Sequence, residues 1–214
     1  MTFLLVVDKY KTKQLTLLKI FSSVKNKVKE MIYFTADTHF SHAKIIELCG
    51  RPFSNVEQMN ETLIKNWNSC VKSNDEIYVL GDFIFKGNGS DANNILKKLK
   101  GKKYLIKGNH DNFLNDSNFD KNNFRWVKDY FVLNYQKTKI ILFHFPIFEW
   151  DGYFRDAIHL FGHVHNSGNN KNAYERFKQL GQNAINVGVD VNNFYPISIE
   201  EIIKIKANNN GVKE

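Results

Sequence analysis

Five short runs of strand-forming residues in this chain each stop at a side chain that can bind a metal ion. Short apolar runs bounded by polar residues are typical of buried strands. In sheets whose strands are joined by helices, ligands bind where the carboxyl ends of the strands gather. We therefore expect the five strand ends to converge on one site. The residues that end these runs are Asp37, His39, Asp82, Asn109, His144, His163 and His165.

Segments with helical spacing alternate with the predicted strands in the first half of the chain. Strands are expected at 31–36, 76–81 and 103–107. Apolar residues recur about every four positions from Met59 to Val71, which predicts a helix over 55–71. Further helices are expected over 41–49 and after an N-cap at Asp91. This alternation indicates an α/β fold with right-handed crossovers between parallel strands.

The second half is richer in strands. Residues 124–135 and 138–145 are predicted to pair as a hairpin. The remaining predictions are a strand at 157–162, a polar surface excursion at 166–183, strands at 184–191 and 195–199, and a short helix at 200–205.

Residues 1–30 differ in composition from the rest of the chain. They hold seven Lys against one Asp and one Glu, which leaves only +3 of the net charge of +8 for residues 31–214. We predict a basic and dispensable extension at 1–30, one domain at 31–206 and a polar tail at 207–214. Within the extension, a membrane-surface helix, a helix packed on the domain and a poorly ordered tail all stay open.

Composition narrows the class of protein. A chain of 214 residues suits one domain, and no apolar run approaches the ~20 residues that span a bilayer. Two cysteines favour a reducing compartment, so we expect a cytoplasmic protein. The charge of residues 31–214 does not by itself argue for a nucleic-acid partner; the basic residues 1–30 permit one without requiring it, and the oligomeric state is left open.

The ligand types indicate which metals the site prefers. Imidazole nitrogens and carboxylate oxygens without thiolates suit divalent Mn, Fe, Zn, Co or Ni, and we expect Mn first. Seven groups are too many for one tetrahedral ion, but they fit two ions that share a carboxylate. The spacing of two between Asp37 and His39, and between His163 and His165, puts each pair on one side of an extended chain. Two carboxylates against two divalent ions leave a positive site, which favours a phosphate.

The ordered set of motifs resembles the calcineurin-like metallophosphoesterases. The matching segments are Asp37-Thr38-His39, Gly81-Asp82, Gly108-Asn109-His110-Asp111, His144 and Gly162-His163-Val164-His165. Segments 34–42, 51–53 and 186–190 are similar to a bacterial and phage branch of small phosphoesterases. The resemblance implies a single-domain, four-layer α/β/β/α sandwich with two mixed β-sheets.

The same resemblance implies a role for each matching residue. Asp37, His39 and His165 would hold one metal, Asn109, His144 and His163 the other, and Asp82 would bridge them. A hydroxide shared by the two ions would attack phosphorus in line with the leaving oxygen. His110 would donate a proton to the leaving group or stabilise it, and Asp111 is expected to orient His110.

Two arginines are candidate substrate ligands. Arg51 follows a helix that begins at the metal-binding loop, so it either meets a substrate phosphate or fixes its own loop. Arg155 adjoins the aromatic segment 148–154, whose rings either line the substrate mouth or belong to the core. His42 either approaches the site or caps a helix, and His159 is expected to be a packed or exposed strand residue.

The leading hypothesis is a metal-dependent phosphoesterase. A small phosphodiester is the expected substrate ahead of a phosphomonoester or a phosphoprotein, because the chain has little room for a substrate domain. A nuclease is a special case of this activity. A non-catalytic metal-binding scaffold on the same fold is the alternative, and a structural metal site is disfavoured because such sites are usually rich in thiolates.

Overall fold

The computed structural model describes residues 30–166, 180–181 and 183–211. The chain divides into two units, Met1–Glu30 and Met31–Glu214, and the described residues other than Glu30 belong to the second. The predictions for the basic extension, and most of those for the 166–183 excursion, lie outside the described residues. The proposed domain boundaries stay predictions.

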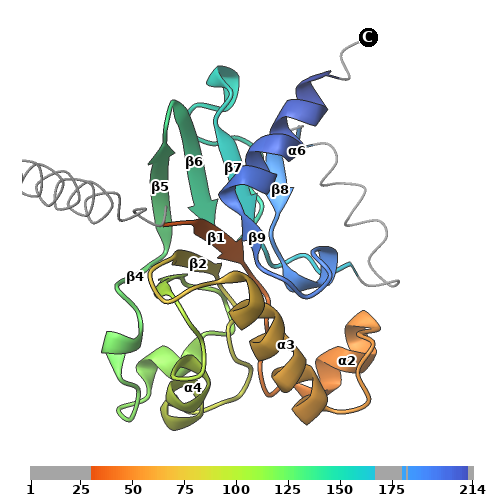
Figure 1. Cartoon of the computed structure of the whole chain (residues 1–214), viewed down its shortest axis with the longest axis vertical. Coiled ribbons are helices and arrows are strands. Elements are labelled where there is room, and N and C mark those ends of the chain that lie inside the picture. The colour runs from red at the N-terminus through yellow and green to blue at the C-terminus, as the bar shows by residue number, and fades with distance from the viewer. Residues whose placement is uncertain (1–29, 167–179, 182, 212–214) are drawn as a thin grey trace, which may run out of the picture. The chain divides into compact units, whose positions relative to one another are not determined.

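Two mixed β-sheets form the centre of the domain (Figure 1). The first sheet has the order β4 (Val127–Lys128), β3 (Lys102–Ile106), β2 (Glu76–Leu80), β1 (Ile32–Thr35) and β9 (Ile197–Ser198). Its strands are parallel except for β9, which pairs antiparallel with β1. The second sheet has the order β5 (Tyr130–Tyr135), β6 (Thr138–Phe143), β7 (Ile158–Phe161) and β8 (Ala184–Asn186). Here β5 and β6 form the predicted antiparallel hairpin, and β6, β7 and β8 are parallel.

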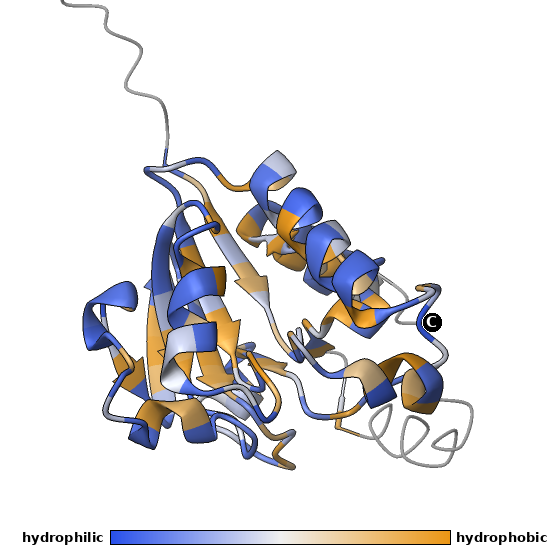
Figure 2. Ribbon diagram, turned by 90° about the horizontal axis from the view of Figure 1, so that it is seen from below, coloured by the Kyte–Doolittle hydropathy of each residue, from blue (hydrophilic) through white to orange (hydrophobic). Residues whose placement is uncertain are grey.

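Helices complete the layers around the sheets. Three of them, α2 (Ala43–Cys49), α3 (Val56–Cys70) and α4 (Gly89–Leu96), pack against the first sheet, and α6 (Ile199–Gly211) follows β9. Hydrophobic residues concentrate in the strands, while the helices alternate hydrophobic and hydrophilic residues as covering helices do (Figure 2). The predicted four-layer sandwich with two mixed sheets is confirmed. None of the helices in the described part of the chain has the length and apolar character of a membrane span.

Buried apolar side chains fill the spaces between the layers. Trp67 and Met59 lie between the helices and the first sheet, and Phe34 and Ile140 lie between the two sheets. A smaller cluster around Trp150 covers the outer face of the second sheet. With both faces of each sheet covered in this way, the loops at the strand ends are where polar side chains can meet.

The segment predicted as one strand over 124–135 divides between the two sheets. Its first part, β4, pairs with β3, and its second part, β5, pairs with β6. Asp129 alone separates the two strands. The charged pair Lys128-Asp129 marks this crossing in the sequence, but strand-forming residues on both sides of it led us to predict one strand.

The ends of other helices and strands also differ from the predictions. Asn88, not Asp91, is the N-cap of α4, and the Asp91 side chain accepts the Asn88 N–H at 3.2 Å to complete a capping box. The strand predicted over 184–191 ends at Asn186 and is followed by a 3₁₀ helix, η5 (Val189–Val191). The last helix continues through residues assigned to a polar tail, as far as Gly211.

His159 is a packed residue of β7 with no exposed surface. Its Nε2 accepts the Ile147 N–H at 3.3 Å, and its Nδ1 lies 3.4 Å from the Ile141 carbonyl oxygen. The Nε2 also lies 3.3 Å from the Phe145 carbonyl oxygen, so backbone groups of three residues surround the buried ring. Burial lowers the pKa of His159 from 6.5 to about 4.

Acid should therefore destabilise the fold partly through His159. The unfolded chain protonates this imidazole near pH 6.5 and the folded protein only near pH 4, so stability is lost as the pH falls between these values. The loss is ~3 kcal/mol below both values. His159→Phe removes this titration while keeping a ring. The free energy of unfolding, measured in urea, should fall by about that much more for the wild type than for the variant between pH 7.5 and pH 4. Equal losses in the two proteins would contradict the assignment.

Candidate metal centre

The seven predicted metal ligands lie together where strands of both sheets end. One group is Asp37, His39 and His165, and a second is Asp82, His144 and His163; within each group the candidate ligand atoms lie within 4.8 Å of one another. Asn109 Oδ1 lies 3.0 Å from His144 Nε2 and 3.1 Å from His163 Nδ1, which adds it to the second group. The structure thus brings together all seven residues in two groups.

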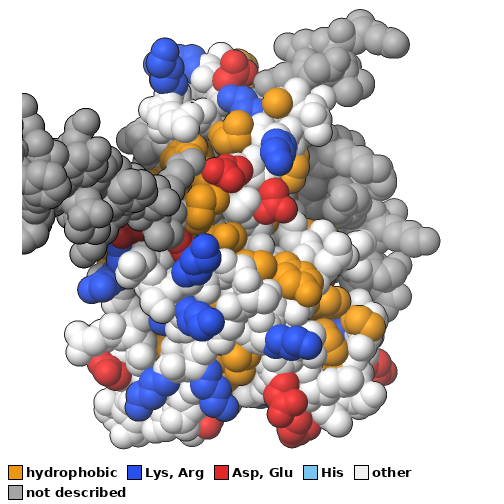
Figure 3. Space-filling model, in the orientation of Figure 1, with side chains coloured by type: hydrophobic (Ala, Val, Ile, Leu, Met, Phe, Trp, Pro, Cys, Tyr) orange, Lys and Arg blue, Asp and Glu red, His pale blue; other side chains and the backbone are white. Residues whose placement is uncertain are grey.

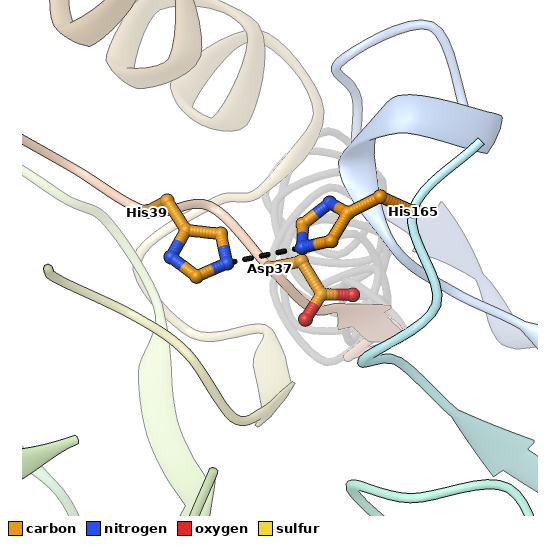
Figure 4. A group of neighbouring side chains, drawn as sticks. All are labelled: Asp37, His39 and His165. Carbon is orange, nitrogen blue, oxygen red and sulfur yellow. Dashed lines mark hydrogen bonds between the residues drawn. The ribbon is translucent and has the colours of Figure 1, made fainter. Parts of the chain in front are cut away.

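In the first group, two imidazole rings face each other. His39 Nε2 lies 3.2 Å from His165 Nε2, with the Asp37 carboxylate beside them (Figure 4). The Nδ1 of His165 donates to Asp190 Oδ2 at 2.7 Å, which leaves its Nε2 to face the site. Burial alone would lower the pKa of His165, but the Asp190 hydrogen bond and the Asp37 charge outweigh it and raise that pKa to about 10. This position attracts positive charge, as a metal-ligand cluster should.

Asp82 lies between the two groups. Its Oδ2 is 3.6 Å from His39 Nε2 in one group and 3.5 Å from His144 Nε2 in the other. Its Oδ1 accepts the His110 N–H at 2.8 Å. Burial favours the neutral acid, but the hydrogen bond and charge of His144 outweigh it and hold the pKa of Asp82 at about 2. A single ionised carboxylate therefore faces ligands of both groups.

The second group is oriented by backbone contacts. His144 Nδ1 lies 2.7 Å from the Leu80 carbonyl oxygen, so the ring donates there and turns its Nε2 toward Asp82. The His163 N–H donates to Asp37 Oδ1 at 2.9 Å, which links the two groups. Imidazole nitrogens held in this way, beside carboxylate and amide oxygens, form a donor set that fits divalent ions.

Four of the seven ligand-type residues have left-handed backbone conformations. The φ angles are 56° for Asp37, 47° for His39, 55° for Asp82 and 69° for His163. Such values are uncommon for residues other than glycine and cluster at functional sites, at a cost of roughly 1–3 kcal/mol each. The prediction that Asp37 and His39, or His163 and His165, converge through extended spacing is wrong. Backbone turns bring them together.

The loops that carry these ligands pass very close to one another. The Asp37 N–H donates to the Gly81 carbonyl at 3.0 Å, and the His39 N–H donates to the Asp82 carbonyl at 3.0 Å. A Cβ on Gly81 would lie 2.7 Å from the Cα of Gly108. The two glycines allow this backbone approach, as expected from the sequence.

The Asp111 carboxylate binds backbone N–H groups and does not contact the His110 ring. Its carboxylate accepts the N–H groups of Asp82, Phe83 and Gly108 at 3.0, 2.8 and 2.8 Å. Burial raises the pKa of Asp111 to about 6, against the effect of these N–H groups. The expected role of aiming His110 is therefore replaced by a role in fixing the loops after β2 and β3.

His110 lies at the edge of the metal-ligand cluster, beside a pocket. Its ring centroid is 5.6 Å from that of His39 and 5.0 Å from that of Phe85. His42 stacks on Phe85 with centroids 3.6 Å apart, and its side chain makes no cap hydrogen bond to α2. His42 therefore occupies the N-cap position of α2, and its side chain faces the pocket instead of making a cap hydrogen bond.

Arg51 is buried, so the expectation that it meets a substrate is wrong. Its guanidinium pairs with Asp190 through Nε to Oδ1 at 2.7 Å and Nη2 to Oδ2 at 3.0 Å. It also donates to the carbonyl oxygens of Asp37 at 2.8 Å and Thr38 at 3.0 Å. The side chain has no exposed surface. Arg51 fixes the first metal-binding loop against η5.

Arg155 lies outside the cluster. Its side chain is 79% exposed, and its charged neighbour is Asp151, with the Arg155 Nη2 3.7 Å from Asp151 Oδ1. Trp150 in the same segment belongs to the core and donates through Nε1 to the Ala157 carbonyl at 3.0 Å. The structure does not bring Arg155 to the metal ligands.

Sequence reasoning missed Asp190. We assigned it to the interior of a strand, whereas it lies in η5 and joins His165 to Arg51. Two signals could have found it. Gly188 interrupts the segment 184–191 that we predicted as one strand, and an arginine that becomes buried needs a carboxylate partner.

Arg51→Ala should destabilise the protein by about 3–5 kcal/mol, because it strands the buried Asp190 carboxylate and two carbonyl groups. Arg155→Ala is the matched control, and its exposed position predicts a change within about 0.5 kcal/mol. Urea unfolding at pH 7.5 measures both. Similar stabilities for the two variants would show that the Arg51 contacts do not hold the loops.

Comparison with known proteins agrees with this architecture. The protein MJ1445 of Methanocaldococcus jannaschii, described as uncharacterized, is 41% identical over 179 residues, covering 81% of this chain and 90% of that protein. The solved structure of protein AQ665 from Aquifex aeolicus, described as of unknown function, matches with a TM-score of 0.65 and 28% identity, over 83% of this chain and all of that one. The Gene 66 protein of Mycobacterium phage L5 is 34% identical over 84 residues, covering 37% of this chain and 39% of that protein.

The family comparison covers the part of the chain that carries the cluster. The calcineurin-like phosphoesterase family matches residues 31–179, a range that contains all seven ligand-type residues and His110. This family implies metal-dependent hydrolysis of phosphate esters, which agrees with the two ligand groups. The chain therefore belongs to the calcineurin-like phosphoesterase family.

Proposed function

We propose that this protein is a phosphodiesterase that works with two divalent metal ions, with Mn as the first choice. The observation that carries the proposal is the position of Asp82 Oδ2, 3.6 Å from a nitrogen of one ligand group and 3.5 Å from a nitrogen of the other. Asp37, His39 and His165 would hold one ion, Asn109, His144 and His163 the second, and Asp82 both.

The chain's own residues have distinct tasks in this proposal. Divalent ions in these groups would supply Lewis acidity toward the phosphoryl oxygens and an activated water. The backbone N–H of His110 donates to Asp82 and fixes the position of the residue, and the His110 ring would donate a proton to the leaving oxygen. Arg51 and Asp111 would keep the ligand loops in place through their backbone contacts. The phosphate is held by charge, since two carboxylates against two divalent ions leave the site positive.

The space beside the site admits a large leaving group. A pocket of about 630 Å³ adjoins His39, His110 and His165. The size of the chain favours a small phosphodiester over a phosphoprotein, because it leaves little room for a substrate domain. The pocket lies on the side of His110, where the leaving group is expected.

Replacement of His110 should separate chemistry from metal binding. His110→Ala is expected to lower kcat for bis(p-nitrophenyl) phosphate with Mn²⁺ by about 10²–10⁴-fold, because it removes a proton donor. Metal content, measured by elemental analysis after gel filtration, should stay at the wild-type value, because the side chain is not a ligand. Loss of metal from this variant would contradict the division of roles.

Asn109→Ala is the matched variant at the neighbouring position. It removes an oxygen that lies 3.0 Å from His144 Nε2, so calorimetry should show at least about tenfold weaker binding at one of two metal sites. Binding of a single ion by the wild type would overturn the two-metal proposal. A non-catalytic scaffold on the same fold would instead show metal binding without turnover for any divalent ion.

A further inference from the structure

The pocket beside the metal-ligand cluster has features that select a ligand. Its lining comes from residues 41–48, from the tip of the loop after β2 and from the cluster itself. The loop that leads from β1 to α2 is joined to the loop after β2. The Phe85 N–H donates to the Phe40 carbonyl at 3.1 Å, and Phe40 and Ile84 form a parallel bridge. The pocket wall is thus fixed by backbone hydrogen bonds.

Planar rings form one wall of this pocket. The His42 and Phe85 rings stack with an interplanar angle of 18°, and the His110 ring meets Phe85 edge-on at 71°. Ile45 and Leu48 add apolar surface, and Leu48 is 49% exposed although it is a large apolar side chain. Aromatic walls of this kind favour planar ligand groups such as bases.

Two lysines give the pocket its charge. Lys44 and Lys86 are exposed residues of the lining, and the Lys86 Nζ lies 5.5 Å from the Phe85 ring centroid. The lining contains no Asp or Glu, and among the described residues neither amine has a carboxylate partner. The pocket therefore suits a group that is both planar and anionic.

We infer that this pocket binds the leaving group of the diester, and that this leaving group is a nucleoside phosphate. The inference rests on the proposed function. Hydrolysis breaks the bond between phosphorus and the leaving oxygen and forms one between phosphorus and the oxygen of water. The leaving oxygen takes its proton from His110, which lines the pocket. The products are a phosphomonoester and a nucleoside phosphate with a free hydroxyl group.

A small diester fits better than a long nucleic acid. The pocket volume of about 630 Å³ is in the range of small-molecule sites. On the face shown in Figure 3, Lys and Arg side chains are scattered singly, with acidic side chains among them, and form no continuous stripe. A polymer would need a basic track that follows its backbone, and this face offers none.

Three diesters with the same retained thymidine phosphate test the inference. Their leaving groups are ethanol, a nucleoside and a nucleoside phosphate, and products are measured by chromatography with Mn²⁺. We expect kcat/KM to rise about tenfold from the ethanol to the nucleoside leaving group, because the base stacks in the pocket. We expect it to rise about tenfold again from the nucleoside to the nucleoside phosphate, because Lys44 and Lys86 bind the added phosphate. Equal values for three hydrolysed diesters would overturn the inference and leave the proposed function intact.

Matched variants locate the effect. Phe85→Leu should reduce the nucleoside-to-ethanol ratio of kcat/KM about tenfold, while Phe154→Leu, at an 82% exposed ring outside the pocket, should not change it. The double variant Lys44→Ala/Lys86→Ala should reduce the second ratio, and the double variant Lys65→Ala/Lys72→Ala, at exposed residues outside the lining, serves as its control.

Direct binding separates failure of this inference from failure of the proposed function. A nucleoside 5′-phosphate should bind the metal-loaded wild-type protein in calorimetry, and about tenfold more weakly after Phe85→Leu or the Lys44/Lys86 double substitution. Absence of binding, or binding that these variants do not weaken, would overturn the inference. Binding that they weaken, in a protein that hydrolyses no diester including the bis-aryl phosphate, would support the pocket and overturn the proposed function.

Discussion

The position of the metal-ligand cluster depends on one buried ion pair that joins the two sheets. Arg51 donates to the carbonyl groups of Asp37 and Thr38, which follow the first sheet's β1, and to Asp190, which follows the second sheet's β8. Asp190 in turn accepts from His165. Removing one partner would leave a buried charge without compensation, which is why such pairs are costly to break. Together with the backbone bridge between Ala36 and Gly188, the pair holds these two loops at a fixed distance, and the first ligand group lies across that junction.

The loops that carry the ligands contain both strained backbone conformations and the hydrogen bonds that offset this strain. Left-handed conformations at Asp37, Asp82 and His163 are unfavourable for residues with side chains. Each of these residues also takes part in a hydrogen bond that is buried or partly buried: Asp37 accepts from His163, and the Asp82 N–H donates to Asp111. Hydrogen bonds to charged groups are worth about 1.5–3 kcal/mol, a size comparable to the strain. The surrounding fold thus holds ligand side chains in directions that an extended chain would not give them.

The sequence predicted the fold class and the residues at the strand ends because both follow from local patterns. Apolar runs, helical spacing and the polar residue after each run are visible without knowledge of tertiary contacts. The errors concern long-range partners. Arg51 and Asp190 are 139 residues apart, and Asp111 contacts the loop after β2 rather than its neighbour His110. The division of 124–135 at Asp129 has the same cause: the charged pair Lys128-Asp129 is visible in the sequence, but the different partners of the two strands, β3 and β6, are not.

Four carboxylates lie in or next to the cluster, and two of them explain why it attracts cations. The Asp111 carboxylate accepts three backbone N–H groups, and the Asp190 carboxylate accepts hydrogen bonds from Arg51 and His165. The negative charge of these two residues is therefore compensated by neighbouring groups of the protein. The remaining two face the ligand nitrogens. Burial raises the pKa of Asp37 to about 6, whereas His144 keeps the pKa of Asp82 at about 2. With His144 beside it, Asp82 is therefore ionised across the neutral range, whereas the pKa of Asp37 lies close to that range. Asp82 supplies a constant negative charge between the two groups, and a cation bound there would favour ionisation of Asp37 as well.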